Sequence, residues 1–121
     1  MKIARILNET KATELAARAL IADRFFPRMW GLLGRSSLPR GEGLVIVPCR
    51  SVHAAFMRFP LDVLFVDSHG VVQHVMQLMP WRLSPIVPAA RMVLELPLGA
   101  VAAARTAPGD VIRILPEVSN A

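Results

Sequence analysis

Nucleophilic and ionisable side chains are concentrated in the range Pro48–Asp67, which reads PCRSVHAAFMRFPLDVLFVD. Cys49 and His53 lie close together here, and a thiolate activated by an imidazole is a nucleophile in hydrolases and transferases. The same groups ligate zinc, but a closed zinc site needs about four ligands, and only His69 and His74 remain to supply nitrogen. His69 stands in a predicted turn and His74 farther along the return strand of that hairpin, so we expect no metal site. We favour a buried structural cysteine near a hydrogen-bonded histidine, since cysteine is among the residues most often buried.

Two acidic residues interrupt apolar strands. Asp62 stands in the run Leu61–Val66, and Glu95 stands in the run Met92–Leu96. A carboxylate in such surroundings must find a partner or change its pKa, and Arg58, four residues before Asp62, is a local candidate. Two acids that converge in one pocket could act as general acid and base. We favour structural roles, as ion pairs or as caps of backbone amides, because structural networks also perturb acids.

A tryptophan and an arginine stand side by side in the proline-rich stretch Pro80–Pro88. Trp81 and Arg82 could form one wall of a ligand or partner site. In the alternative interpretation, the indole closes the end of the β structure while the guanidinium faces water. The predicted ligand-binding site consists of the polar and aromatic residues that interrupt the apolar elements: His53, Arg58, Asp62, Trp81, Arg82 and Glu95.

The composition indicates a folded, basic protein. Its 121 residues are 54% hydrophobic and 19% charged, which argues against disorder and fits a single domain over residues 1–121. Twelve arginines and two lysines give a net charge of +5, which would suit a nucleic-acid partner, but they form no basic tract. Tyrosine is absent, so few aromatic rings are available to stack on bases. No phosphate-binding loop, dinucleotide fingerprint or nucleophile elbow is present, and we expect no cofactor.

The sequence also predicts a compartment. No apolar run approaches the ~20 residues that cross a bilayer, and Glu9 and Glu14 interrupt any secretory signal near the start of the chain. A lone cysteine permits no internal disulfide, which fits a reducing compartment. We therefore expect a cytoplasmic protein without a membrane span.

Apolar alternation and turn residues predict seven strands. In Thr13–Ala22 the alanines favour a helix, but the shortness of the segment and the preceding polar turn favour a strand, which we choose. Asp67–Gly70 is a hairpin turn in which Gly70 can supply a positive φ, and Ala107–Asp110 is a turn before the last strand. The expected strands are Ile3–Leu7, Thr13–Ala22, Leu44–Val47, Leu61–Val66, Val71–Met79, Arg91–Leu96 and Val111–Leu115.

Helices are expected in two places. Asp23 is a suitable N-cap for a helix over about residues 23–33, which Gly34 would terminate. Leu98–Arg105 is compatible with a short second helix. The predicted fold is mainly β, of the α+β kind: a small sandwich or partly closed barrel of about seven strands.

These segments together resemble the domain of unknown function 192 family of uncharacterised proteins. The resemblance covers almost the whole chain and implies a compact β-rich fold; no activity, cofactor or catalytic residue of the family can be carried over. The chain departs from the family at Ala54-Ala55, where members commonly have Thr-Phe, so a hydroxyl and a ring are missing beside His53. It also departs at Leu61, where members commonly have Ile. The stretches that carry the resemblance include Gly31–Arg35, Glu42–Leu44, Phe56–Asp67, Gly70–Val72, Pro80–Arg82, Val93–Gly99 and Gly109-Asp110.

Three functions are compatible with the sequence. The first, which we favour, is a small ligand- or partner-binding accessory domain. The second is a hydrolase or transferase that uses Cys49 with His53, or Asp62 with Glu95. The third is a nucleic-acid-binding module, based on the basic charge.

Overall fold

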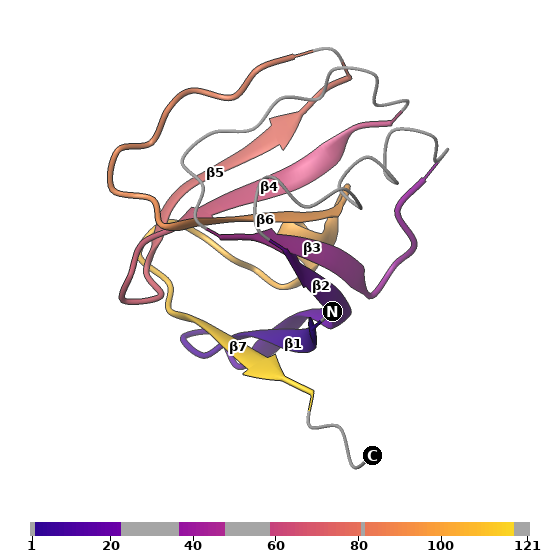
Figure 1. Cartoon of the computed structure of the whole chain (residues 1–121), viewed down its shortest axis with the longest axis vertical. Coiled ribbons are helices and arrows are strands. Elements are labelled where there is room, and N and C mark those ends of the chain that lie inside the picture. The colour runs from indigo at the N-terminus through magenta and orange to yellow at the C-terminus, as the bar shows by residue number, and fades with distance from the viewer. Residues whose placement is uncertain (1, 23–36, 48–58, 81, 118–121) are drawn as a thin grey trace.

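The computed structural model describes residues 2–22, 37–47, 59–80 and 82–117. Within these ranges the protein is mainly β: seven strands form one mixed sheet that curls into a half-barrel, with a single short helix (Figure 1). The mainly β prediction is confirmed, while the helix expected over residues 23–33 lies outside the described ranges. The elements are β1 (Lys2–Asn8), β2 (Thr13–Ala22), β3 (Glu42–Ile46), β4 (Leu61–Val66), β5 (Val72–Leu78), β6 (Met92–Pro97), α1 (Ala100–Ala103) and β7 (Ile112–Pro116).

The strands follow the order β5-β4-β6-β3-β2-β1-β7 across the sheet. All neighbours are antiparallel except β2 and β3, which run parallel and place Leu20 beside Leu44. The segment Thr13–Ala22 is a strand, as predicted, despite its alanines. It pairs with β1 on one side and β3 on the other, so tertiary pairing overrides the helix propensity of alanine.

The two edges of the sheet meet at one end. Val71 forms a bridge with Val111, and the N–H of Val72 donates to the carbonyl oxygen of Asp110 at 2.9 Å. In return, the N–H of Gly109 donates to the carbonyl oxygen of Val72 at 2.8 Å. These contacts join the start of β5 to the turn before β7. In the described part of the chain, they close the half-barrel at this end.

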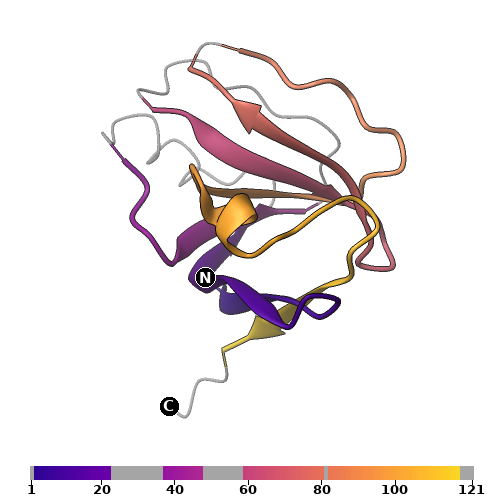
Figure 2. The same ribbon diagram turned by 180° about the vertical axis from the view of Figure 1, so that it is seen from behind.

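Buried apolar side chains cover both faces of the sheet. The inner core lies within the half-barrel, under α1 (Figure 2), and the outer core lies on the opposite face of β3, β4, β5 and β6. Every residue of β4 is buried because both faces are covered. The inner core comprises Ile6, Leu15, Ala16, Ala19, Val45, Leu64, Val66, Val72, Leu94, Leu96, Val101, Ala104 and Ile112. The outer core comprises Leu38, Leu44, Ile46, Leu61, Val63, Phe65, Leu78, Ala90 and Val93.

The hairpin turn between β4 and β5 has the geometry expected from its residues. Gly70 has a φ of 84°, and its N–H donates to the carbonyl oxygen of Asp67 at 3.1 Å. The Asp67 carboxylate accepts hydrogen bonds from the N–H groups of His69 and Val71, at 2.8 and 2.9 Å. These bonds lower the pKa of Asp67, with the N–H of Val71 contributing most. No helix in the described part of the chain is long and apolar enough to cross a membrane.

Candidate functional site

The Asp62 carboxylate caps α1 from a neighbouring strand. Asp62 is 3% exposed, and its Oδ2 atom accepts hydrogen bonds from the N–H groups of Gly99 at 2.9 Å and Val101 at 3.0 Å. Gly99 is the N-cap residue of α1 and has no side chain with which to cap the helix. Asp62 therefore takes over this function, and its carboxylate holds α1 against the inner core.

Glu95 lies in the centre of the sheet on its opposite face. In the register it stands beside Val63 of β4 and Leu44 of β3, which both belong to the outer core. It is 6% exposed, and its carboxylate forms no hydrogen bond or ion pair with any group in the described ranges. Burial raises the pKa of Glu95 from 4.5 to about 7, because the low-polarity surroundings disfavour the charged form.

The structure does not bring Asp62 and Glu95 together. Asp62 pairs with Leu96, and Glu95 pairs with Val63, so the two acids are offset by one position along the paired strands. Since side chains alternate between faces along a strand, Asp62 points to the inner core and Glu95 to the outer core. A mechanism that needs both carboxylates at one substrate has no geometric support.

The remaining predicted site residues are only partly described. Arg82 is exposed in the loop after β5, where its N–H donates to the carbonyl oxygen of Met79 at 3.2 Å. The residues Cys49, His53, Arg58 and Trp81 lie outside the described ranges.

The two other histidines considered as metal ligands lie in the hairpin turn after β4 and in β5. The N–H of His69 donates to Asp67 in the hairpin turn. His74 stands opposite Phe65, and the two ring centroids are 5.5 Å apart. In the part of the chain that the structure describes, no group of three or more His, Cys, Asp or Glu residues is placed to hold a metal ion.

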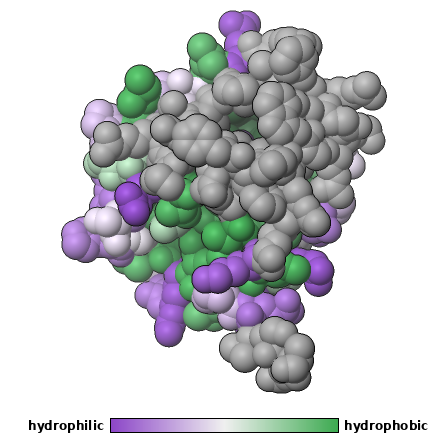
Figure 3. All heavy atoms as spheres, in the orientation of Figure 1, coloured by the Kyte–Doolittle hydropathy of each residue, from purple (hydrophilic) through white to green (hydrophobic). Residues whose placement is uncertain are grey.

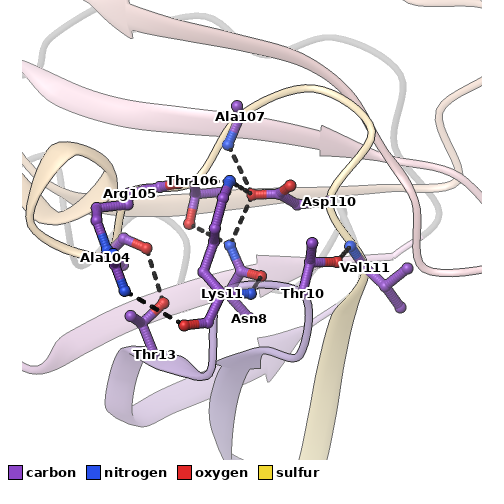
Figure 4. A network of polar contacts seen from close by, with 10 residues as sticks. All are labelled: Asn8, Thr10, Lys11, Thr13, Ala104, Arg105, Thr106, Ala107, Asp110 and Val111. Atoms are coloured by element: carbon purple, nitrogen blue, oxygen red, sulfur yellow. Dashed lines mark hydrogen bonds and ion pairs between the residues drawn. The ribbon is translucent and has the colours of Figure 1, made fainter.

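A buried polar network that the sequence did not reveal joins the turn after β1 to the turn before β7 (Figure 4). Nζ of Lys11 lies 2.8 Å from Oδ2 of Asp110, and it also donates to the carbonyl oxygen of Arg105 at 3.0 Å. Nδ2 of Asn8 donates to the same Asp110 oxygen at 3.0 Å and to Oγ1 of Thr106 at 2.9 Å. We call Asn8, Lys11, Thr106 and Asp110 the clasp.

The hydrogen bonds of the clasp stabilise the ionised form of Asp110. The hydrogen bond from Lys11, followed by those from Asn8 and the N–H of Ala107, lowers the pKa of Asp110 from 3.8 to about 2. Asn8 is fully buried, and Asp110 is 6% exposed. Its groups satisfy one another, so the clasp is a structural connection between two distant turns. In the sequence, the polar residues indicated each of the two turns separately, but not the contact between them.

The fold and its buried polar groups define a class of protein: a small half-barrel β domain whose short helix is capped by a buried aspartate, with a second buried acid on the opposite face of the sheet. Residues 6–114 match the domain of unknown function 192 family, described as “Uncharacterized ACR”. The chain belongs to this family, which confirms the resemblance seen in its motifs.

Two relatives agree with this assignment. The chain is 33% identical over 113 residues to a UPF0127 protein of Pyrococcus abyssi, covering 88% of this chain and 94% of that protein. It is 34% identical over 110 residues to a UPF0127 protein of Pyrococcus furiosus, covering 87% and 93%.

Two solved structures share the fold. One is a protein of unknown function from Novosphingobium aromaticivorans, with a TM-score of 0.75, 21% identity, and coverage of 92% of this chain and 83% of that one. The other, from Sinorhizobium meliloti, bears a name that assigns it provisionally to transcription regulation; its TM-score is 0.72 at 22% identity, with coverage of 93% and 92%. At these identities the likeness concerns the fold alone.

Proposed function

We propose that the protein is a binding domain without catalytic chemistry of its own, in which Glu95 receives a cationic or hydrogen-bond-donating group of a ligand or partner. The observation that carries this proposal is the position of Glu95 between Val63 and Leu44, on an apolar face and without a described partner. Removing a carboxylate from water is costly unless it is paired. A ligand that supplies a cationic or hydrogen-bond-donating group to this carboxylate would recover that cost on binding.

A catalytic function is the second candidate, and it rests on a different property of the same residue. The pKa of Glu95 is about 7, which suits a general acid or base at neutral pH. Asp62 offers no assistance, because within the described ranges its carboxylate accepts hydrogen bonds from the start of α1 and it faces the inner core. The enzyme that uses Cys49 with His53 depends on residues outside the described ranges.

The nucleic-acid function receives less support from the charges. Three basic side chains form ion pairs with nearby acids, which neutralise part of their charge. Nη2 of Arg5 lies 2.8 Å from Oε2 of Glu14, and Nζ of Lys11 lies 2.8 Å from Oδ2 of Asp110. Nη1 of Arg113 lies 3.2 Å from Oε1 of Glu9. Their positive charge is thus less available to a phosphate backbone.

We further propose that residues 1–121 act as a single domain in the cytoplasm, on the basis of chain length and the single cysteine.

The binding proposal is tested by observing the Glu95 carboxyl carbon directly by NMR. In protein labelled with ¹³C-glutamate, hexylamine and agmatine are titrated as cationic probes, with hexanol as the uncharged match for hexylamine. We expect a saturable shift of the Glu95 signal with an amine and not with hexanol. The Glu95→Gln variant lacks that carboxyl carbon, so it is followed by its backbone amide shifts, which should show no saturable change with hexylamine. Glu117→Gln, at an exposed position, should retain the response of the wild type. Absence of a saturable response, or an equal response in Glu95→Gln, would contradict the proposal.

A further inference from the structure

Exposed aliphatic side chains are concentrated in one loop. The β5–β6 loop comprises residues 79–91, all described except residue 81. Leu83 is 76% exposed, Ile86 is 72% exposed and Met79 is 45% exposed. Single exposed apolar residues are common on protein surfaces, but a cluster of them marks an interaction site. In Figures 1 and 3, which share one orientation, the loop runs along the outside of the molecule beside β5 and apolar side chains project from that margin.

The second half of this loop is anchored to the outer core, and the exposed apolar residues precede the anchor. Ala90 is buried in the outer core, and Val87 packs against it. The N–H of Ala90 donates to the carbonyl oxygen of Val87 at 2.9 Å. Pro85 and Pro88 restrict the backbone between these anchors and the exposed tip. A loop that is already ordered loses little conformational entropy on docking.

The charge of the loop is entirely positive. Arg82 and Arg91 are exposed near its two ends. No aspartate or glutamate occurs in the sequence between Asp67 and Glu95, and Glu95 itself is buried. The two arginines favour an anionic surface as the partner of this loop, and the exposed leucine and isoleucine favour one that accepts aliphatic side chains.

We propose that the β5–β6 loop docks the protein on an anionic phospholipid surface. Leu83 and Ile86 would enter the boundary between headgroups and acyl chains, and Arg82 and Arg91 would contact lipid phosphates. Lipid is the occupant that fits both observations, because aliphatic side chains flanked by arginines, with no acidic residue in the loop, suit the boundary between anionic headgroups and acyl chains. Only side chains would enter the apolar layer, since irregular backbone is not tolerated there. The proposal rests on the loop and is independent of the Glu95 binding proposal.

Vesicle flotation tests this docking. Vesicles of phosphatidylcholine containing phosphatidylserine should carry the full-length protein, vesicles of phosphatidylcholine alone should not, and added salt should weaken binding. The double variant Leu83→Ser/Ile86→Ser should bind roughly tenfold more weakly or worse. Arg82→Ala should bind roughly fivefold more weakly. Because these side chains are exposed, the variants should unfold at the wild-type temperature.

Matched controls separate the loop from general surface effects. Leu98→Ser removes another exposed aliphatic group, which is 47% exposed after β6, and Arg18→Ala removes an exposed arginine on β2. Both should bind vesicles as the wild type does. The Glu95→Gln variant should also bind normally, so failure of the Glu95 proposal would leave this result unchanged.

Three outcomes would overturn the docking proposal. The first is equal flotation with neutral and anionic vesicles, or none with either. The second is unaltered binding by Leu83→Ser/Ile86→Ser. The third is a vesicle-free dimer, or a complex with an acidic protein, that the double variant abolishes while flotation is absent; the loop would then be a protein interface.

Discussion

Lys11 and Asp110 form an ion pair of 2.8 Å although they lie 99 positions apart in the sequence. The pair joins the turn after β1 to the turn before β7, at the end of the half-barrel where the sheet edges meet. Because Asn8 and the N–H of Ala107 bind the same Asp110 oxygen, that one carboxylate organises both turns.

Asp110→Ala should lower the melting temperature at neutral pH, because it removes the carboxylate that accepts hydrogen bonds from Lys11 and from the buried amide of Asn8. The pKa of Asp110 is 3.8 in its unperturbed state and about 2 in the folded protein. Its contribution to stability is therefore complete above pH 4 and is lost as the pH falls through about 2. Thermal unfolding followed by circular dichroism should show a weaker dependence on pH in this range for the variant. Equal dependence in both proteins would contradict the assigned role.

Glu95→Gln should raise the free energy of unfolding at high pH. The folded state binds the Glu95 proton more tightly, with a pKa of about 7 against 4.5. Below pH 4.5 the carboxyl is protonated in both states and does not lower the free energy of unfolding. As the pH rises toward about 7, the unfolded state ionises while the folded state keeps the proton, so Glu95 lowers the free energy of unfolding increasingly. The gain in the variant should reach about 3 kcal/mol above pH 7 and vanish at low pH. Urea unfolding across this range measures it, with Glu117→Gln as the exposed control; a gain that does not vary with pH would exclude the titration of Glu95 as its cause.

Asp62→Leu should destabilise the protein by about 3 kcal/mol, because the N–H groups of Gly99 and Val101 lose their shared acceptor. Asp62→Asn is the matched control, since one amide oxygen can accept both bonds, and it should cost much less. Denaturant unfolding measures the difference, and hydrogen exchange at Gly99 and Val101 should accelerate selectively in Asp62→Leu. Similar costs for both variants would argue against the capping role.

Gly70→Ala should destabilise the protein more than Gly109→Ala. Both glycines have a positive φ, of 84° and 93°, which costs an L-residue about 1–2 kcal/mol. A Cβ atom at Gly70 would also lie 2.8 Å from the carbonyl oxygen of Ile112, whereas none of the neighbouring atoms lies within 4 Å of a Cβ at Gly109. The difference between the two free energies of unfolding therefore isolates the clash with β7. Equal costs would show that β7 moves aside without penalty.

The sequence predicted the strands because their signals are local. Alternation and turn residues located all seven described strands and the hairpin turn at Asp67–Gly70, and a short helix within Leu98–Arg105 is present as α1. It also singled out Asp62 and Glu95 as buried acids, which they are. The faces that these acids occupy depend on register, and a shift of one residue reverses them. The clasp was missed because its members come from turns about a hundred positions apart, and no local pattern encodes such a contact.

The pairing of β1 with β7 has a consequence for how the molecule is made. β1 emerges first from the ribosome among the described strands, yet one of its two neighbours, β7, is synthesised last. Until then β1 has only the hairpin contact with β2, and its other edge remains open to unwanted pairing. Such distant contacts slow folding, so the nascent chain should complete its sheet only after synthesis of β7.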